Sequence, residues 1–144
     1  MHLQTASQVI NYAVELEDKS TKFYEDLAEK FEEQRETFLS LAKENKKNKL
    51  LIQRTYNEVV SDALETGFSF GGLYTDDYLI EINLTQNENY SDALSKSLEI
   101  EEKIQKFYVN TAEKSKSFLA DVPRIFEKIA KKRDERKEKL KSLL

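Results

Sequence analysis

The sequence has no cysteine and no tryptophan, and its 144 residues include only one proline and three glycines. Without cysteine, the chain can form no disulfide and offers no thiolate nucleophile and no sulfur ligand for zinc or an iron–sulfur cluster. The scarcity of glycine and proline, with 35% charged and 39% hydrophobic residues, favours long amphipathic helices over a turn-rich sandwich or barrel. We therefore expect an all-α protein.

Charge and hydropathy exclude further classes of partner. The net charge is -4, from 23 basic and 27 acidic residues that are interspersed along the chain, so the basic block typical of nucleic-acid binding is missing. No apolar run approaches the roughly 20 residues that a membrane-spanning helix requires, and the first residues do not have the pattern of a signal peptide. We expect a cytoplasmic protein with neither a nucleic-acid nor a membrane partner.

The chain contains an internal repeat. Residues 14–30 align without gaps on residues 98–114, and nine of the seventeen aligned pairs are identical. A second similarity follows, because the segment that starts at Phe38 matches the segment that starts at Phe126, with Phe, Ala and two Lys retained. Each half therefore predicts a helix pair, and two helix pairs predict an antiparallel four-helix bundle.

We expect one domain over residues 1–144, with repeat one at about 6–64 and repeat two at about 91–144. The connector between them, about 65–90, is long enough to run the length of a helix of about 25 residues, roughly 38 Å. Such a crossover sets the two helix pairs side by side. An alternative for its Leu-Ile-Glu-Ile stretch is a short strand or a dimer edge.

Local signals indicate where the helices begin. Thr5 or Ser7 is suited to cap the first helix, and Ser91 is predicted to cap the third, with Asp92 in its first turn. Pro123 suits the first turn of the fourth helix because its φ is already helical.

Each predicted helix carries a seam of apolar residues spaced alternately three and four apart, as a bundle requires. Polar residues interrupt every seam near its middle. They are Glu17 in the first helix, Asn45 and Asn48 in the second, Glu101 in the third, and Arg133 and Arg136 in the fourth. Burying a charge costs several kcal/mol unless it is paired or bound to metal, so we expect these residues to satisfy one another.

A Glu seven residues before the Tyr of a Phe-Tyr pair occurs once in each repeat, as Glu17 with Tyr24 and as Glu101 with Tyr108. This pattern, doubled along the chain, resembles the ferritin-like superfamily and most closely its rubrerythrin-related branch of di-iron carboxylate proteins. The resemblance implies a ferritin-like bundle in which Glu17 and Glu101 occupy metal-ligand positions. In the family, each repeat adds a Glu and a His from an L-A-x-x-E-x-x-H motif, and two metal ions, usually iron, serve in ferrous oxidation or peroxide reduction.

The remaining ligand positions depart from that pattern. Asn45 and Asn48 replace the Glu and His of the first motif, Arg133 and Arg136 replace those of the second, and His2 is the one histidine in the chain. Two glutamates and two arginines sum to zero charge without metal. We predict an arginine–carboxylate network in place of the metal and no cofactor. In the alternative reading, the polar residues only set helix register or the arginines extend into solvent.

Other tyrosine and acidic residues, and the lysine-rich end of the chain, are further candidates for a functional role. Tyr24 and Tyr108 are either redox-active neighbours of a metal or core residues with a hydroxyl partner, and we favour the second. Glu44, Asp134 and Glu135 flank the lost ligand positions and are expected to be solvated. The lysine-rich carboxy-terminal segment alternates with acids, which favours an exposed helix face over a phosphate site.

Three functions follow from this sequence. The favoured one is a non-catalytic binding or structural module, acting as a homodimer, with no catalytic residue. The second is a di-iron or di-manganese oxidoreductase of rubrerythrin type, which uses Glu17 and Glu101 with other ligands in peroxide or iron handling. The third is a carrier of a small apolar ligand beneath the connector, although packing of the connector on the bundle explains the same aromatic residues. These residues are Phe68, Phe70, Tyr74 and Tyr78.

Overall fold

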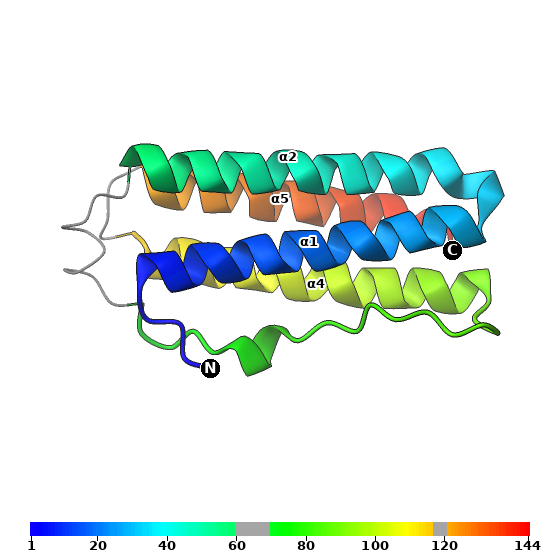
Figure 1. Cartoon of the computed structure of the whole chain (residues 1–144), viewed down its shortest axis with the longest axis horizontal. Helices are drawn as coiled ribbons and strands as arrows, with labels where there is room; N and C mark the ends of the chain where they lie inside the picture. Colours follow the sequence, from blue (N-terminus) through cyan, green and yellow to red (C-terminus); the bar gives the residue numbers. More distant parts are fainter. Residues whose placement is uncertain (60–69, 117–120) are drawn as a thin grey trace.

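The computed structural model describes residues 1–59, 70–116 and 121–144. Four long helices lie along a common axis (Figure 1). They are α1 (Ala6–Lys30), α2 (Arg35–Val59), α4 (Tyr90–Lys114) and α5 (Asp121–Lys141), with short 3-10 turns η1 (Glu32–Gln34) and η2 (Thr75–Tyr78). No strand occurs in these described ranges. The prediction of an all-α chain with four helices is confirmed for this part of the molecule.

The helices form two hairpins. The short turn η1 connects α1 to α2, and these two helices pack mainly against each other. In the same way, α4 packs mainly against α5. Residues 70–89 run along the bundle beside α1 and α4, from one end of the helices to the other (Figure 1). This path agrees with the predicted crossover. The expected end of repeat one at residue 64 and the start of the connector at 65 lie outside the described residues.

Lysine side chains fasten the connector to the helices. Three ammonium groups donate hydrogen bonds to its backbone carbonyls, which lack the strand partners that a sheet provides. These bonds are Lys103 to Leu79 (2.7 Å), Lys96 to Asn83 (2.8 Å) and Lys30 to Thr85 (2.7 Å). The Leu-Ile-Glu-Ile stretch is therefore held to α4 at Leu79 without forming the strand considered as an alternative.

Two described aromatic residues of the connector pack into the bundle. Phe70 and Tyr78 are only 2% and 1% exposed and belong to the hydrophobic core. Tyr74 is exposed and stacks on His2, with 4.5 Å between ring centroids. Phe68 lies outside the described residues. Core packing thus accounts for two of the four aromatic residues that suggested a ligand cavity.

Corresponding residues of the two repeats make corresponding core contacts. Tyr24 stacks on Phe38 with ring centroids 6.3 Å apart, and Tyr108 stacks on Phe126 with centroids 6.2 Å apart. All four side chains are at most 2% exposed. Because full burial of a large apolar side chain contributes about 1.5–3 kcal/mol, these layers stabilise both hairpins.

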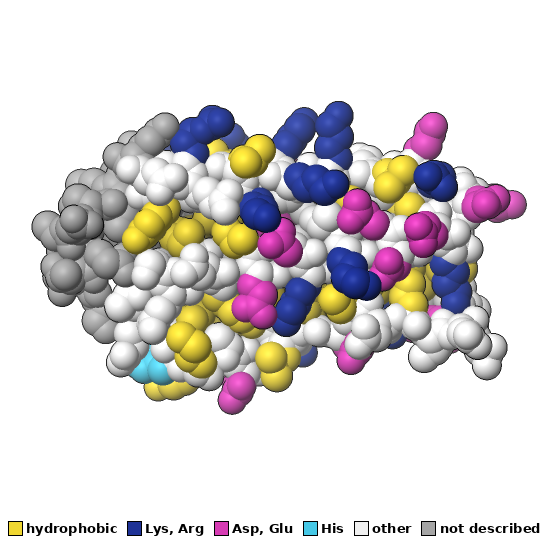
Figure 2. Space-filling view, in the orientation of Figure 1, with side chains coloured by type: hydrophobic (Ala, Val, Ile, Leu, Met, Phe, Trp, Pro, Cys, Tyr) yellow, Lys and Arg dark blue, Asp and Glu magenta, His cyan; other side chains and the backbone are white. Residues whose placement is uncertain are grey.

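The surface is charged with both signs interspersed, as Figure 2 shows over α1 and α2. Two ion pairs, Lys49 with Asp18 at 2.9 Å and Lys46 with Glu25 at 3.4 Å, link these helices. Exposed pairs of this kind contribute at most about 1 kcal/mol, so the core and not the surface holds the hairpin together. None of the described helices combines the length and apolar character needed to span a membrane.

Two of the predicted helix starts agree with the structure. Thr5 caps α1 in a capping box with Gln8, in which each side chain bonds to the backbone of the other residue. α5 begins at Asp121, which puts Pro123 in its first turn, where the missing N–H leaves no bond unmade.

The prediction that Ser91 caps the third helix is wrong. The cap of α4 is Asn89, whose side-chain oxygen accepts a hydrogen bond from the backbone N–H of Asp92 at 2.8 Å. Asn and Ser are comparably good caps, so residue type alone does not decide between Asn89 and Ser91. The helix begins where the side chain can accept from an unpaired backbone N–H of the first turn, which here is that of Asp92. Ser91 falls inside the helix, and Asp92 lies in the first turn as expected.

We predict that Asn89→Ala lowers the free energy of unfolding by about 1 kcal/mol, because it leaves the N–H of Asp92 without its partner. Ser91→Ala is the matched control and is expected to be neutral or slightly stabilising, because Ala has the higher helix propensity. Urea unfolding of both variants measures the difference. Equal losses for the two substitutions would show that the cap is misplaced.

Candidate functional site

The six polar residues that interrupt the predicted seams all lie inside the bundle. They are Glu17 of α1, Asn45 and Asn48 of α2, Glu101 of α4, and Arg133 and Arg136 of α5. Arg136 has the largest exposed fraction of the six, at 4%, and the two glutamates and Arg133 are at 0%. Such burial requires that each charge have a partner within the layer.

Arg133 is the central residue of this layer. Its Nη1 donates to both carboxylate oxygens of Glu101, each at 2.9 Å, and its Nη2 donates to Oε2 of Glu17 at 2.5 Å. Nη1 also lies 3.3 Å from the hydroxyl of Ser20. A single guanidinium group therefore joins the carboxylates of α1 and α4, a role suited to its planar array of donors.

Arg136 extends the layer toward α2. Its Nη2 donates to Oε1 of Glu101 at 2.8 Å, and its Nη1 donates to the side-chain oxygen of Asn45. The guanidinium lies over the ring of Tyr24, 5.4 Å from the centroid, where the ring quadrupole attracts a cation. Asn45 uses its amide group to donate to Ser20 at 2.9 Å, which closes the chain of bonds.

The two tyrosines make reciprocal bonds between the hairpins. Tyr24 of α1 donates to Glu101 of α4 at 2.8 Å, and Tyr108 of α4 donates to Glu17 of α1 at 2.7 Å. Burial, reinforced by the adjacent carboxylate, raises the pKa of each hydroxyl well above its usual value of 10.0. Both hydroxyls therefore keep their protons and act as donors, as expected for core tyrosines with a hydroxyl partner.

The layer is neutral as a whole. Burial acts to raise the pKa of Glu101, but the charges of Arg133 and Arg136 outweigh it and lower the pKa below its usual value. Burial acts to lower the pKa of Arg133, and Glu101 and Glu17 outweigh it in the same way, so that its pKa is raised. With both glutamates and both arginines ionised, two negative and two positive charges cancel.

Some donors of the layer have no partner. The side-chain nitrogen of Asn48 and the Nε atoms of Arg133 and Arg136 are buried and make no hydrogen bond within the described part of the chain. Asn45 thus completes the network as expected, whereas the amide nitrogen of Asn48 does not.

This set of residues does not fit the two-metal site that the resemblance implies. Every carboxylate oxygen of Glu17 and Glu101 already accepts a hydrogen bond from an arginine or a tyrosine. Two guanidinium groups, which cannot lose their protons, would repel a cation placed between them. Among the described residues, no three His, Cys, Asp or Glu side chains are grouped so as to hold a metal ion.

The other candidate ligands are not members of the buried layer. His2 stacks on Tyr74 beside the connector. Asp134 and Glu135 are exposed, and Glu44 is half-buried at the surface. These positions agree with the expectation that the flanking carboxylates are solvated.

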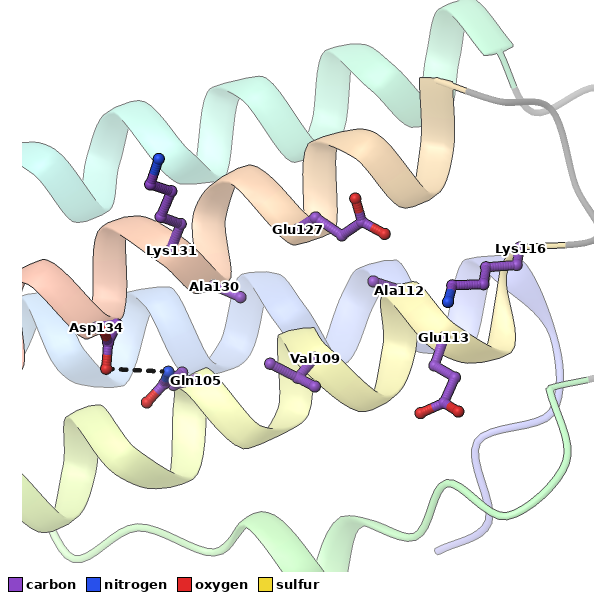
Figure 3. Close-up of a pocket in the computed structure, with 9 residues that line it drawn as sticks. All are labelled: Gln105, Val109, Ala112, Glu113, Lys116, Glu127, Ala130, Lys131 and Asp134. Atoms are coloured by element: carbon purple, nitrogen blue, oxygen red, sulfur yellow. Dashed lines mark hydrogen bonds between the residues drawn. The ribbon is translucent and has the colours of Figure 1, made fainter.

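A groove of about 540 Å³ separates the outer faces of α4 and α5 (Figure 3). Val109, Ala112 and Ala130 supply its apolar lining, and Gln105 donates to Asp134 at 3.3 Å across it. None of its lining residues belongs to the buried layer, so this groove gives no access to the charged groups.

Ser20 is a member of the network that the sequence reasoning missed. Its hydroxyl accepts from Asn45 and lies within bonding distance of Arg133. The available signal was its position, because Ser20 lies in the predicted seam three residues after Glu17 and is the kind of small polar residue that a buried network uses.

Comparison with protein-family models, curated proteins and solved structures found no match to this chain. The function must therefore be inferred from the geometry of the buried layer and from the sequence pattern.

We predict that Glu101→Gln lowers the free energy of unfolding by about 3–5 kcal/mol, because it leaves two buried guanidinium groups with a single carboxylate. Glu102→Gln, one residue away on the exposed face of α4, is the control and should change stability by less than about 0.5 kcal/mol. Chemical denaturation in metal-free buffer measures both. A loss equal to that of the control would show that the network contributes nothing.

The same pair of proteins tests the ionisation of Glu101. Because the folded state lowers its pKa below 4.5, the charged form stabilises the fold above about pH 4.5, and this contribution is lost as pH falls through the lowered pKa. The stability difference between wild type and Glu101→Gln should stay constant near neutral pH and shrink in acid. A difference that grows on acidification would contradict an ionised Glu101.

Proposed function

We propose that the chain is a ferritin-like, rubrerythrin-related bundle in which a metal-free arginine–carboxylate network replaces the di-metal site, and that it works as a non-catalytic binding or structural module. The observation that carries this proposal is the saturation of the layer. All four carboxylate oxygens of Glu17 and Glu101 accept hydrogen bonds from neighbouring side chains.

The relation to the ferritin-like superfamily is supported by the doubled Glu and Phe-Tyr pattern and by its geometry. Glu17 and Glu101 lie on different hairpins, and each is bonded to the tyrosine of the other repeat. Residues at the four remaining ligand positions of the family pattern, on α2 and α5, are buried as well. Under this proposal, the layer keeps the family's ligand positions and fills them with side chains of different chemistry.

The protonation states of the titratable groups in the layer support a non-catalytic role. A general acid or base needs a pKa near the working pH and a path to the reacting group. Instead, Tyr24 and Tyr108 have pKa values well above 10.0, and the pKa of Glu101 is lowered from its usual 4.5. These three groups keep one protonation state across neutral pH, which suits a structural role.

The di-metal alternative has less support. It requires carboxylates that turn away from arginine, and it requires further oxygen or nitrogen donors in the layer. Arg133 has 0% exposure, so its charge stays beside any ion placed between Glu17 and Glu101.

The carrier alternative has one observation in its favour. A groove of about 380 Å³ lies between α1 and the connector, with Leu3, Tyr12, Thr75 and Leu79 among its lining residues. This volume is near the lower end for small-molecule sites. The connector does not cover a cavity at Tyr78, however, because that side chain is itself part of the core.

Metal analysis separates the proposal from the di-metal alternative. Protein purified after growth with added iron and manganese is expected to hold far less than one metal ion per chain, and chelator is expected to leave its melting temperature unchanged. The variant Asn45→Glu, Asn48→His, Arg133→Glu, Arg136→His restores the family's ligands and serves as the positive control. About two bound ions per wild-type chain, as in the family's di-metal sites, would overturn the proposal.

A further inference from the structure

A small pocket of about 200 Å³ lies between α2 and α5, on a different side of α5 from the groove of Figure 3. It differs from that groove because a member of the buried network, Arg136, is among its lining residues. The charged or hydroxyl-bearing side chains around it are Ser40, Glu44, Lys132, Glu135, Arg136 and Lys139. The pocket thus joins the surface to the polar layer.

Arg136 has a hydrogen-bond donor that the protein does not use. The residue is 4% exposed, and its two Nη atoms are bonded to Asn45 and Glu101. Its Nε is buried without any partner among the described residues. An unmet buried donor costs about 1–3 kcal/mol. Arg136 therefore lines the pocket with part of its hydrogen-bonding capacity unused by the described residues.

Two further cations flank Arg136 in this pocket. Lys132 and Lys139 lie four residues before and three residues after it, which puts the three side chains on one face of α5. Neither lysine takes part in an ion pair within the described ranges, whereas Lys137 on the same helix pairs with Asp134. These two ammonium groups are therefore available to a ligand.

The acids of the pocket balance the charge of its lysines. Glu44 and Glu135 offset the charges of Lys132 and Lys139, and the charge of Arg136 is already balanced by Glu101 within the buried layer. The affinity for an anionic ligand therefore depends on close contact with the two ammonium groups and with Arg136, and not on a net positive field.

The volume sets the size of the ligand. About 200 Å³ is below the roughly 300–1,000 Å³ of sites for drug-sized molecules and well above the roughly 30 Å³ that a water molecule occupies. We propose that this pocket binds a small tetrahedral oxyanion of the phosphate class, held by Arg136, Lys132 and Lys139. The sequence predicts that the lysine-rich face of α5 is only an exposed surface. The structure adds that Arg136 on this face has a buried donor without a partner among the described residues.

The proposal is tested by titrating the full chain with inorganic phosphate at constant ionic strength, with chloride in exchange. Calorimetry should show saturable binding, and the melting temperature should rise with phosphate because only the folded state holds the site. A parallel titration with glycerol 3-phosphate distinguishes a free anion from the phosphoryl end of a larger ligand, and binding of either supports the site. No saturable binding of either would overturn it.

Rim variants locate the site without disturbing the buried layer. Lys132→Gln and Lys139→Gln are each expected to weaken phosphate binding about three- to tenfold through the loss of a charge-assisted bond. Glu135→Gln should strengthen binding, because it removes a like charge beside the anion. The matched control is Lys131→Gln, which removes the same charge one residue away in the groove of Figure 3 and should leave binding unchanged. An equal loss in that control would show that phosphate only screens the surface, which would also overturn the proposal.

Discussion

The structure depends on one guanidinium group placed between two carboxylates. Arg133 binds Glu17 of one hairpin and Glu101 of the other, and the three side chains are fully buried. Buried ion pairs often contribute no more stability than apolar side chains of the same volume, whereas removing one partner is strongly destabilising. We therefore infer that the network acts on specificity. The network favours one register between the two hairpins, because a different register would leave a buried charge without a partner, at a large cost in free energy.

The sequence predicted the position of this layer because helix period and burial are linked. Each helix has an apolar seam that is interrupted by a polar residue, and burial of the seam also buries that residue. The exposed fraction is 0% for Glu17, Asn45, Glu101 and Arg133, as this argument requires. The sequence could not predict which donor meets which acceptor. That choice depends on side-chain torsions within a crowded layer. The Nη atoms of Arg133 bond to carboxylates there, whereas the amide nitrogen of Asn48 has no partner among the described residues.

The exact ends of the helices and the contacts of the connector were harder to predict from the sequence than the position of the layer. Several residues near a helix start are good caps, and a shift of two residues from Ser91 to Asn89 changes the free energy too little to be read from composition. The connector's length indicated a crossover, but the lysines that hold it, such as Lys103 at the carbonyl of Leu79, look like ordinary surface residues in the sequence. Only the folded bundle brings these groups together.

Charge neutrality also sets the cost of changing this layer one residue at a time. Replacing Arg133 with Glu would take the four ionised groups from a net charge of zero to minus two, inside a layer whose ionised members are at most 4% exposed. Replacing Glu101 alone would leave plus one, with two guanidinium groups facing one carboxylate. Each single step buries an unbalanced charge, which costs several kcal/mol. A metal-binding layer and the present one are therefore two separate solutions to the same constraint, and a passage between them requires coordinated substitutions on both hairpins.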